Sequence, residues 1–140
     1  MRYLLDTCLI SELSKSVPNQ KVIEWLKKIS SDSLFLSVIT IGEIRKGLSK
    51  LQSSEKKERL TDWLDTLLKL YRKRILSIDL RIAEKWGLLQ GNAEKIGKPM
   101  SSVDSLLAAT AIVNNLTLVT RNESDFEVGE VPIINPWKLP

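Results

Sequence analysis

Four acidic residues stand where an α/β fold would bring them together. Asp6 ends the apolar segment RYLL, and Glu43 is expected in the first turn of a helix that follows a second apolar strand. Asp104 lies at the start of a later helix, and Asp125 follows the strand LTLVT. Ligands of parallel α/β sheets bind outside the carboxyl ends of the strands, and a buried carboxylate is costly unless something compensates its charge. These positions predict one depression in which carboxylates could hold a divalent metal ion.

Each of the four acids also has a purely structural interpretation. Asp6 could cap the helix that follows it. Thr40-x-x-Glu43 and Ser101-x-x-Asp104 both match the capping box, in which an acid three residues on returns a hydrogen bond to the cap. The fourth acid, in a polar loop, could be solvated surface. For each of the last three acids considered alone, the structural interpretation is favoured. For all four acids together, however, the structural interpretations require several independent coincidences, whereas a shared metal site explains all four positions at once.

Composition limits the chemistry further. The chain has no histidine and one cysteine, Cys8, which excludes Ser-His-Asp, Cys-His and histidine-based zinc sites as well as an internal disulfide. Carboxylates alone favour hard ions such as Mg²⁺ or Mn²⁺. The net charge of +4 suggests a polyanionic partner only weakly. No apolar run approaches the ~18 residues of a membrane span, and no secretory leader is recognisable, so we expect a cytoplasmic protein.

Strand and helix patterns alternate along the chain. This alternation predicts an α/β fold of three-layer α/β/α architecture, with a central parallel sheet of four to five strands covered on both faces. No linker or repeat interrupts the 140 residues, so residues 1–140 are expected to form one domain. The expected strands are 2–5, 33–40, 74–79, 116–120 and an edge strand at 131–134, and the expected helices follow Thr7 and Pro18 and span 39–51, 59–71, 79–96 and 102–114.

Four segments, in order, resemble the motifs of VapC-type PIN-domain ribonucleases. LLDTCLISEL is similar to the first motif and LSVITIGEIRKGL to the second. The stretch 97–114, with a small-residue helix after Asp104, resembles the third, and LTLVTRNESDF resembles the fourth. Cys8 replaces the usual Asn beside the first aspartate, and Asn122 stands where many relatives carry an acid. Any one motif is weak, but four in series over almost the whole chain are specific.

The resemblance implies a metal-dependent endoribonuclease toxin that uses Mg²⁺ or Mn²⁺, forms a homodimer and is inhibited by a VapB-like antitoxin. By motif match, Asp6, Glu43 and Asp104 are the expected catalytic and metal-binding acids, and either Asn122 or Asp125 fills the fourth position. Hydroxyl groups beside the acids could orient them, and basic residues at the rim could hold the RNA backbone. The orienting candidates are Thr7, Ser37, Thr120 and Asn122, and the RNA-binding candidates are Arg45, Lys46, Arg72, Arg74 and Arg121.

Other protein classes fit the sequence less well. A receiver-type phosphotransfer domain needs an adjacent acidic pair after the first strand, where this chain has only Asp6. A haloacid-dehalogenase-like phosphatase needs Asp-x-Asp, and Cys8 takes the second position. The stronger alternative is a catalytically inactive PIN-like module that binds RNA or protein. Metal titration separates the two, because an inactive site should show no Mg²⁺- or Mn²⁺-dependent change in stability.

Overall fold

A five-stranded parallel sheet forms the centre of the molecule in the computed structural model, which describes residues 1–140. The strands are β1 (Tyr3–Leu5), β2 (Leu34–Ser37), β3 (Ile75–Leu76), β4 (Thr117–Val119) and β5 (Ile133–Ile134). Their order in the sheet is β3-β2-β1-β4-β5, and every neighbouring pair is parallel. β1 therefore lies at the centre of the sheet, as the continuous apolar run before Asp6 requires.

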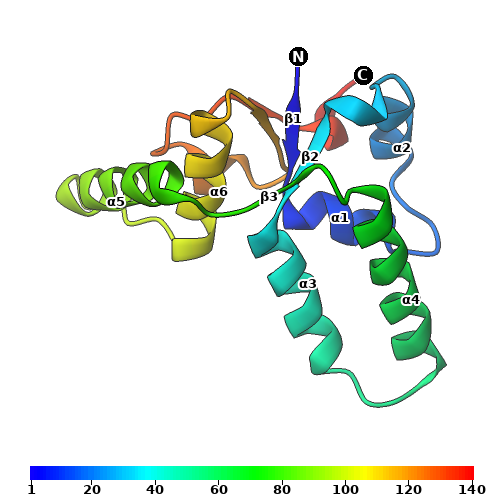
Figure 1. Cartoon of the computed structure of the whole chain (residues 1–140). Helices are drawn as coiled ribbons and strands as arrows, with labels where there is room; N and C mark the ends of the chain where they lie inside the picture. Colours follow the sequence, from blue (N-terminus) through cyan, green and yellow to red (C-terminus); the bar gives the residue numbers. More distant parts are fainter.

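Helices cover both faces of this sheet (Figure 1). α1 (Thr7–Leu13), α2 (Gln20–Lys27), α3 (Val38–Ser49) and α4 (Glu55–Leu70) pack into one apolar cluster, and α5 (Leu80–Lys95) and α6 (Ser102–Val113) pack into the other. Leu4 faces the α5–α6 cluster, whereas Leu5 faces the α1–α4 cluster, as the twofold alternation of a strand dictates. The predicted three-layer fold is confirmed. None of the helices combines the length and the apolar character needed to cross a membrane.

Helix caps shorten two of the predicted strands. The strand expected over 33–40 ends at Ser37, because the Ser37 hydroxyl accepts the Ile39 N–H at 3.1 Å and starts α3. The strand expected over 74–79 contains only Ile75–Leu76, since Asp79 caps α5 by accepting the Ile82 N–H at 2.9 Å. Ser37 was expected inside the first of these strands and Asp79 at the end of the second, but the side chains of both accept helix N–H groups instead.

Other elements differ from the prediction in polar stretches, where no apolar pattern marks a helix. α4 begins at Glu55 rather than at residue 59, because Ser54 caps a charged first turn that adds nothing to the apolar stripe. Three short 3₁₀ helices were not predicted: η1 (Ser31–Ser33), η2 (Glu123–Phe126) and η3 (Pro136–Lys138). The second of these carries Asp125, one of the four acids singled out in the sequence.

Candidate active site

Asp6 lies at the carboxyl end of the central strand, and its side chain is only 6% exposed. Its Oδ1 accepts the Thr7 N–H at 2.7 Å, and its Oδ2 accepts the Thr120 hydroxyl at 2.7 Å and the Cys8 thiol at 3.4 Å. Thr120 follows β4, the parallel neighbour of β1, so the sheet register brings this donor to Asp6. Neutral donors therefore hold the buried carboxylate, and no basic side chain pairs with it.

Glu43 lies in the second turn of α3, not in the first turn as predicted, because α3 begins at Val38. Thr40 is inside the helix, so the expected capping box at Thr40-x-x-Glu43 does not form. Instead, the Thr7 hydroxyl donates to Glu43 Oε1 at 2.5 Å and lies 3.2 Å from the Thr40 hydroxyl. Thr7 therefore connects the two acids: its backbone N–H binds Asp6 and its hydroxyl binds Glu43.

Asp104 lies in the first turn of α6, where Ser101 is the N-cap. The Ser101 hydroxyl accepts the Asp104 N–H at 3.1 Å, but the Ser101 N–H does not donate back to the carboxylate. The capping box is thus only half formed. Burial raises the pKa of Asp104 above its usual range, and the charges of Asp125, Asp6 and Glu43 raise it further against a lowering contact with Ser101. The fold therefore brings the four acids within electrostatic range of one another.

Asp125 and Asp104 line the same cavity, which has a volume of about 420 Å³. It opens between η2 and the loop that joins α5 to α6. Asn122 lies on a neighbouring polar hollow instead, and its N–H donates to the Thr120 hydroxyl at 3.0 Å. Of the two candidates for the fourth position, Asp125 is the one that shares a cavity with another acid of the site.

The acidic cluster, defined here as Asp6, Glu43, Asp104 and Asp125, suits a hard divalent ion. Its donors are carboxylate oxygens, and no lysine or arginine neutralises them. No three acidic or thiol groups lie close enough to hold one ion among themselves alone. Mg²⁺ characteristically takes one or two carboxylates and keeps several waters, so the donor set fits such an ion. All ion pairs of the chain lie elsewhere: Lys15–Glu12, Arg45–Asp65 and Lys138–Glu123.

Cys8 and Ser37 behave differently from what their positions suggested. The Cys8 thiol donates to Asp6, while its sulfur accepts the Arg121 N–H at 3.5 Å, so the residue keeps a polar contact with the first acid. Burial raises the pKa of this thiol, and the negative charge of Asp6 raises it further. Ser37 caps α3 and makes no hydrogen bond to an acid, so it is not an orienting donor in this structure.

Arg74 makes several structural contacts. Its guanidinium donates to the carbonyls of Ser31, Leu34 and Leu70 and lies over the Tyr71 ring, 4.6 Å from the centroid. These contacts tie the end of α4 to the start of β2. Binding of RNA by Arg74 stays a prediction, and these contacts disfavour it because three of the five N–H donors of the guanidinium already serve carbonyls of the chain.

The other basic candidates remain exposed. Arg45 lies 3.8 Å from Asp65, an ion pair between α3 and α4 that solvent reaches. The guanidinium of Arg121 lies over the Trp137 ring, 5.0 Å from its centroid. Lys46 and Arg72 make no ion pair.

Two residues near Asp104 were missed from the sequence. The side-chain amide of Gln90, on α5, donates to the Ser105 hydroxyl at 2.6 Å and lies 3.2 Å from the Met100 carbonyl and 3.3 Å from that of Ser101. It thereby holds the start of α6. Lys98 lines the cavity of Asp104 and Asp125. The predicted Gly97–Pro99 turn before Asp104 could have drawn attention to Lys98. Nothing in the sequence distinguishes Gln90 from other polar residues of an amphipathic helix.

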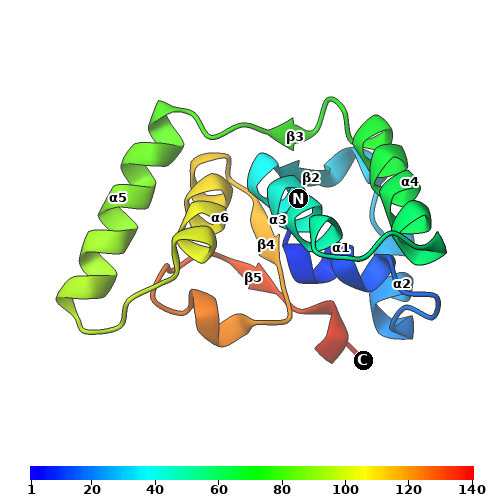
Figure 2. The same cartoon turned by 90° about the horizontal axis from the view of Figure 1, so that it is seen from below.

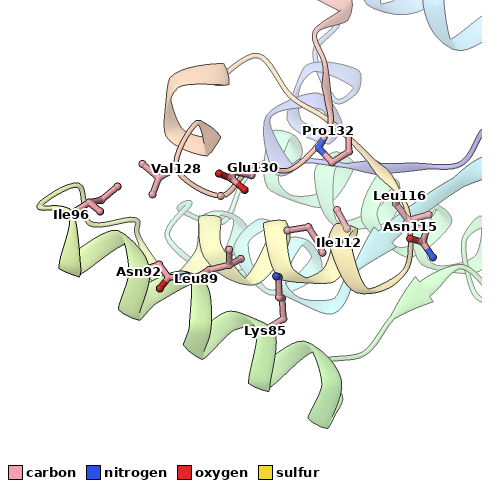
Figure 3. A pocket seen from close by; sticks show the side chains of 12 residues that line it. Lys85, Leu89, Asn92, Ile96, Ile112, Asn115, Leu116, Val128, Glu130 and Pro132 are labelled. Carbon is pink, nitrogen blue, oxygen red and sulfur yellow. The ribbon is translucent and has the colours of Figure 1, made fainter.

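A separate cavity of about 520 Å³ lies away from the acidic cluster (Figure 3). It opens between α5, α6 and the segment before β5, and its lining mixes apolar side chains with Lys85, Asn92 and Glu130. None of the four acids lines it. Figure 2 shows α5 and α6 together on one side of the sheet, remote from α4.

Comparisons with known proteins agree with this geometry. The family model of the PIN domain matches residues 3–130. Toxin FitB of Neisseria gonorrhoeae is 36% identical over 135 residues, covering 96% of this chain and 97% of the relative. VapC ribonuclease Y4jK of Sinorhizobium fredii is 33% identical over 136 residues, covering 96% and 97%. The crystal structure of FitAcB from Neisseria gonorrhoeae has a TM-score of 0.92 to this chain at 36% identity, covering 98% of this chain and 99% of that chain.

Proposed function

Because this chain belongs to the PIN-domain family, we propose that it is a metal-dependent endoribonuclease that hydrolyses RNA phosphodiester bonds as the toxin of a toxin-antitoxin pair. Two relatives that match along almost their whole length carry the names toxin and VapC ribonuclease. The observation that carries the proposal is the acidic cluster, whose charges no basic side chain offsets. Residues 1–140 act as one nuclease domain.

We assign the four acids as the metal-binding and catalytic groups and Mg²⁺ or Mn²⁺ as the cofactor. When bound, such an ion supplies an activated water and offsets charge on the phosphate. The chain itself fixes the acids beforehand: Thr120 and the Thr7 N–H hold Asp6, and the Thr7 hydroxyl holds Glu43. Ready-placed ligands lower the cost of ordering the site when the ion enters. Like charges otherwise repel both one another and a phosphate.

The proposed partners follow from the same family membership. A toxin implies an inhibitor made with it, so we propose a VapB-like antitoxin as the protein partner and a homodimer as the assembled form. The substrate is RNA. Exposed basic residues outside the acidic cluster are available to hold its backbone, among them Lys46, Arg72 and Arg121.

A catalytically inactive PIN-like module that binds RNA or protein is the alternative. The intact acidic cluster disfavours it, because a module without catalysis has no need for four carboxylates without basic partners. Retention of such repelling charges stabilises nothing in the absence of a cation.

The test is cleavage of mixed cellular RNA by the purified protein, with and without Mg²⁺ or Mn²⁺. Asp6→Asn is the test variant, and Asp62→Asn, at an exposed site on α4, is the matched control. We expect metal-dependent cuts that the first variant loses and the second keeps, at a temperature where melts show both variants to be folded. Metal titration of the melting temperature accompanies the assay. If neither cleavage nor a metal-dependent rise in melting temperature occurs, the inactive module replaces the nuclease.

A further inference from the structure

Lys98 is the cationic side chain of the cavity that Asp104 and Asp125 line. We propose that its ammonium group binds a phosphate of the RNA backbone beside the scissile bond. This inference rests on the proposed function and adds a substrate-binding residue to it. The whole lining consists of Lys98, Pro99, Met100, Ser101, Asp104, Ser124, Asp125, Glu127 and Val128.

The cavity combines acidic side chains, which can hold a metal ion, with one lysine, which can bind an anion. This combination suits a negatively charged ligand that binds together with a metal ion. Lys98 is the single basic residue among its lining, against three acids. Nevertheless its ammonium group forms no ion pair with any of them. A lysine that merely neutralised the acids would sit within ion-pair distance of one. An unpaired ammonium is instead free to bind phosphate, for which it offers a point charge with three donors.

The backbone of Lys98 is fixed although its side chain is exposed. Gly97 adopts a positive φ of 72°, which glycine accepts without strain. The Lys98 N–H donates to the Ala93 carbonyl at 2.9 Å, and the Gly97 N–H donates to the Glu94 carbonyl at 3.0 Å. These two bonds form a Schellman motif that closes α5. The motif presents the lysine at a set point on the rim of the cavity.

The segment after Lys98 leads directly into the site. Pro99 restricts the backbone, and Met100 is buried in the α5–α6 cluster. Ser101 then caps the helix that carries Asp104. Only six positions therefore separate the lysine from the acid, and both ends of this segment are anchored. A phosphate held by Lys98 lies beside the acidic cluster rather than at a remote surface.

The test compares Lys98→Ala and Lys98→Arg with the control Lys95→Ala, an exposed lysine of α5 that does not line the cavity. The Schellman bonds come from the backbone, so none of the variants should change the melting temperature appreciably. Binding of a fluorescein-labelled single-stranded RNA of mixed sequence is measured in Ca²⁺ over a range of salt, with gels to check that the RNA stays intact. Cleavage of mixed cellular RNA in Mg²⁺ is measured in parallel.

For Lys98→Ala we expect roughly five-fold weaker RNA binding. The slope of log K against log salt should become shallower by about 0.7, the loss of one phosphate contact on a single strand. Lys98→Arg should restore both, and Lys95→Ala should change neither. The Mg²⁺-induced rise in melting temperature should persist in Lys98→Ala, because the lysine does not hold the metal.

Equal RNA affinity and salt slope in Lys98→Ala and Lys95→Ala would overturn the inference. A lost Mg²⁺ response in Lys98→Ala would also overturn it, because the lysine would then act on the metal site. Failure of the proposed nuclease function looks different: the wild-type protein would cut no RNA in Mg²⁺, while the binding comparison of the variants still decides the role of Lys98.

Discussion

Replacing Thr120 with valine tests how Asp6 is held in place. Thr120 is fully buried, and its hydroxyl donates to Asp6 Oδ2 at 2.7 Å. Valine keeps the volume and branching of threonine, so no cavity forms and the lost hydrogen bond dominates. A hydrogen bond to a charged group contributes about 1.5–3 kcal/mol. The Asn122 N–H also loses its acceptor, but that residue is exposed and water can replace it. We therefore expect a loss of about 2 kcal/mol in the free energy of unfolding.

This loss converts into a measurable change in melting temperature. With an unfolding entropy of about 2.1 cal/mol/K per residue, a 140-residue domain should melt roughly 7 °C lower for that free-energy loss. Metal binding should weaken as well, because groups that orient a ligand typically change metal affinity about 10- to 100-fold when removed. Melts without metal, Mg²⁺ titrations followed by the melting temperature, and RNA cleavage supply the three readouts.

Thr110→Val is the matched control. Thr110 is equally buried, but its hydroxyl donates to the Leu106 carbonyl of its own helix at 2.7 Å, a carbonyl that the helix already uses. For Thr110→Val we expect the free energy of unfolding to fall by less than about 1 kcal/mol. The rise in melting temperature on adding Mg²⁺ should be unchanged. In an Asp6→Asn background the cost of Thr120→Val should shrink. Equal costs for the two threonine variants, with full Mg²⁺ affinity in both, would refute the role assigned to Thr120.

Three further perturbations test neighbouring parts of the structure. Burial and the other carboxylates raise the pKa of Asp104, so the metal-free folded state binds its proton more tightly than the unfolded state. The free energy of unfolding should thus fall as pH rises from the usual value of 3.8 through the raised pKa, and melts in chelator should show this component missing in Asp104→Asn. Gln90→Leu should weaken Mg²⁺ binding, measured by thermal titration, because the start of α6 loses its tie to α5. Arg74→Met should lower the free energy of unfolding by about 1–2 kcal/mol in denaturant melts while RNA cleavage per folded molecule stays unchanged.

The arrangement of layers was predictable because it depends on patterns that are local in sequence. Leu4 and Leu5 alternate between the two apolar clusters, and the stripe with Leu64 and Leu67 faces the core as its helical spacing requires. Element ends were less predictable. Ser37 and Asp79 are compatible with either a strand end or a helix cap, and the tertiary position of the following helix decides between them.

The acids were predictable for a different reason from the groups around them. Asp6 and Asp125 follow strands that lead to the same edge of the sheet, so topology alone brings them near each other. The roles of Arg74 and Gln90 were not predictable. Both side chains bind backbone carbonyls of segments remote in sequence, and no sequence pattern marks such contacts. A guanidinium in a basic run looks like a phosphate ligand until its bonds to backbone carbonyls are seen.

Cys8 shows how a departure from the family pattern can leave the site intact. Where the resemblance expects the amide of Asn, the thiol both donates to Asp6 Oδ2 at 3.4 Å and accepts the Arg121 N–H at 3.5 Å. Its raised pKa keeps the proton on sulfur near neutral pH, so the donor persists. Hydrogen bonds donated by a thiol are longer and weaker than those donated by an amide. The Thr120 hydroxyl therefore contributes more than Cys8 to holding Asp6 in place. The buried aspartate at the end of the first strand is therefore held from two directions, by Thr120 just after β4 and by residues of α1, and its carboxylate charge remains available for a metal ion.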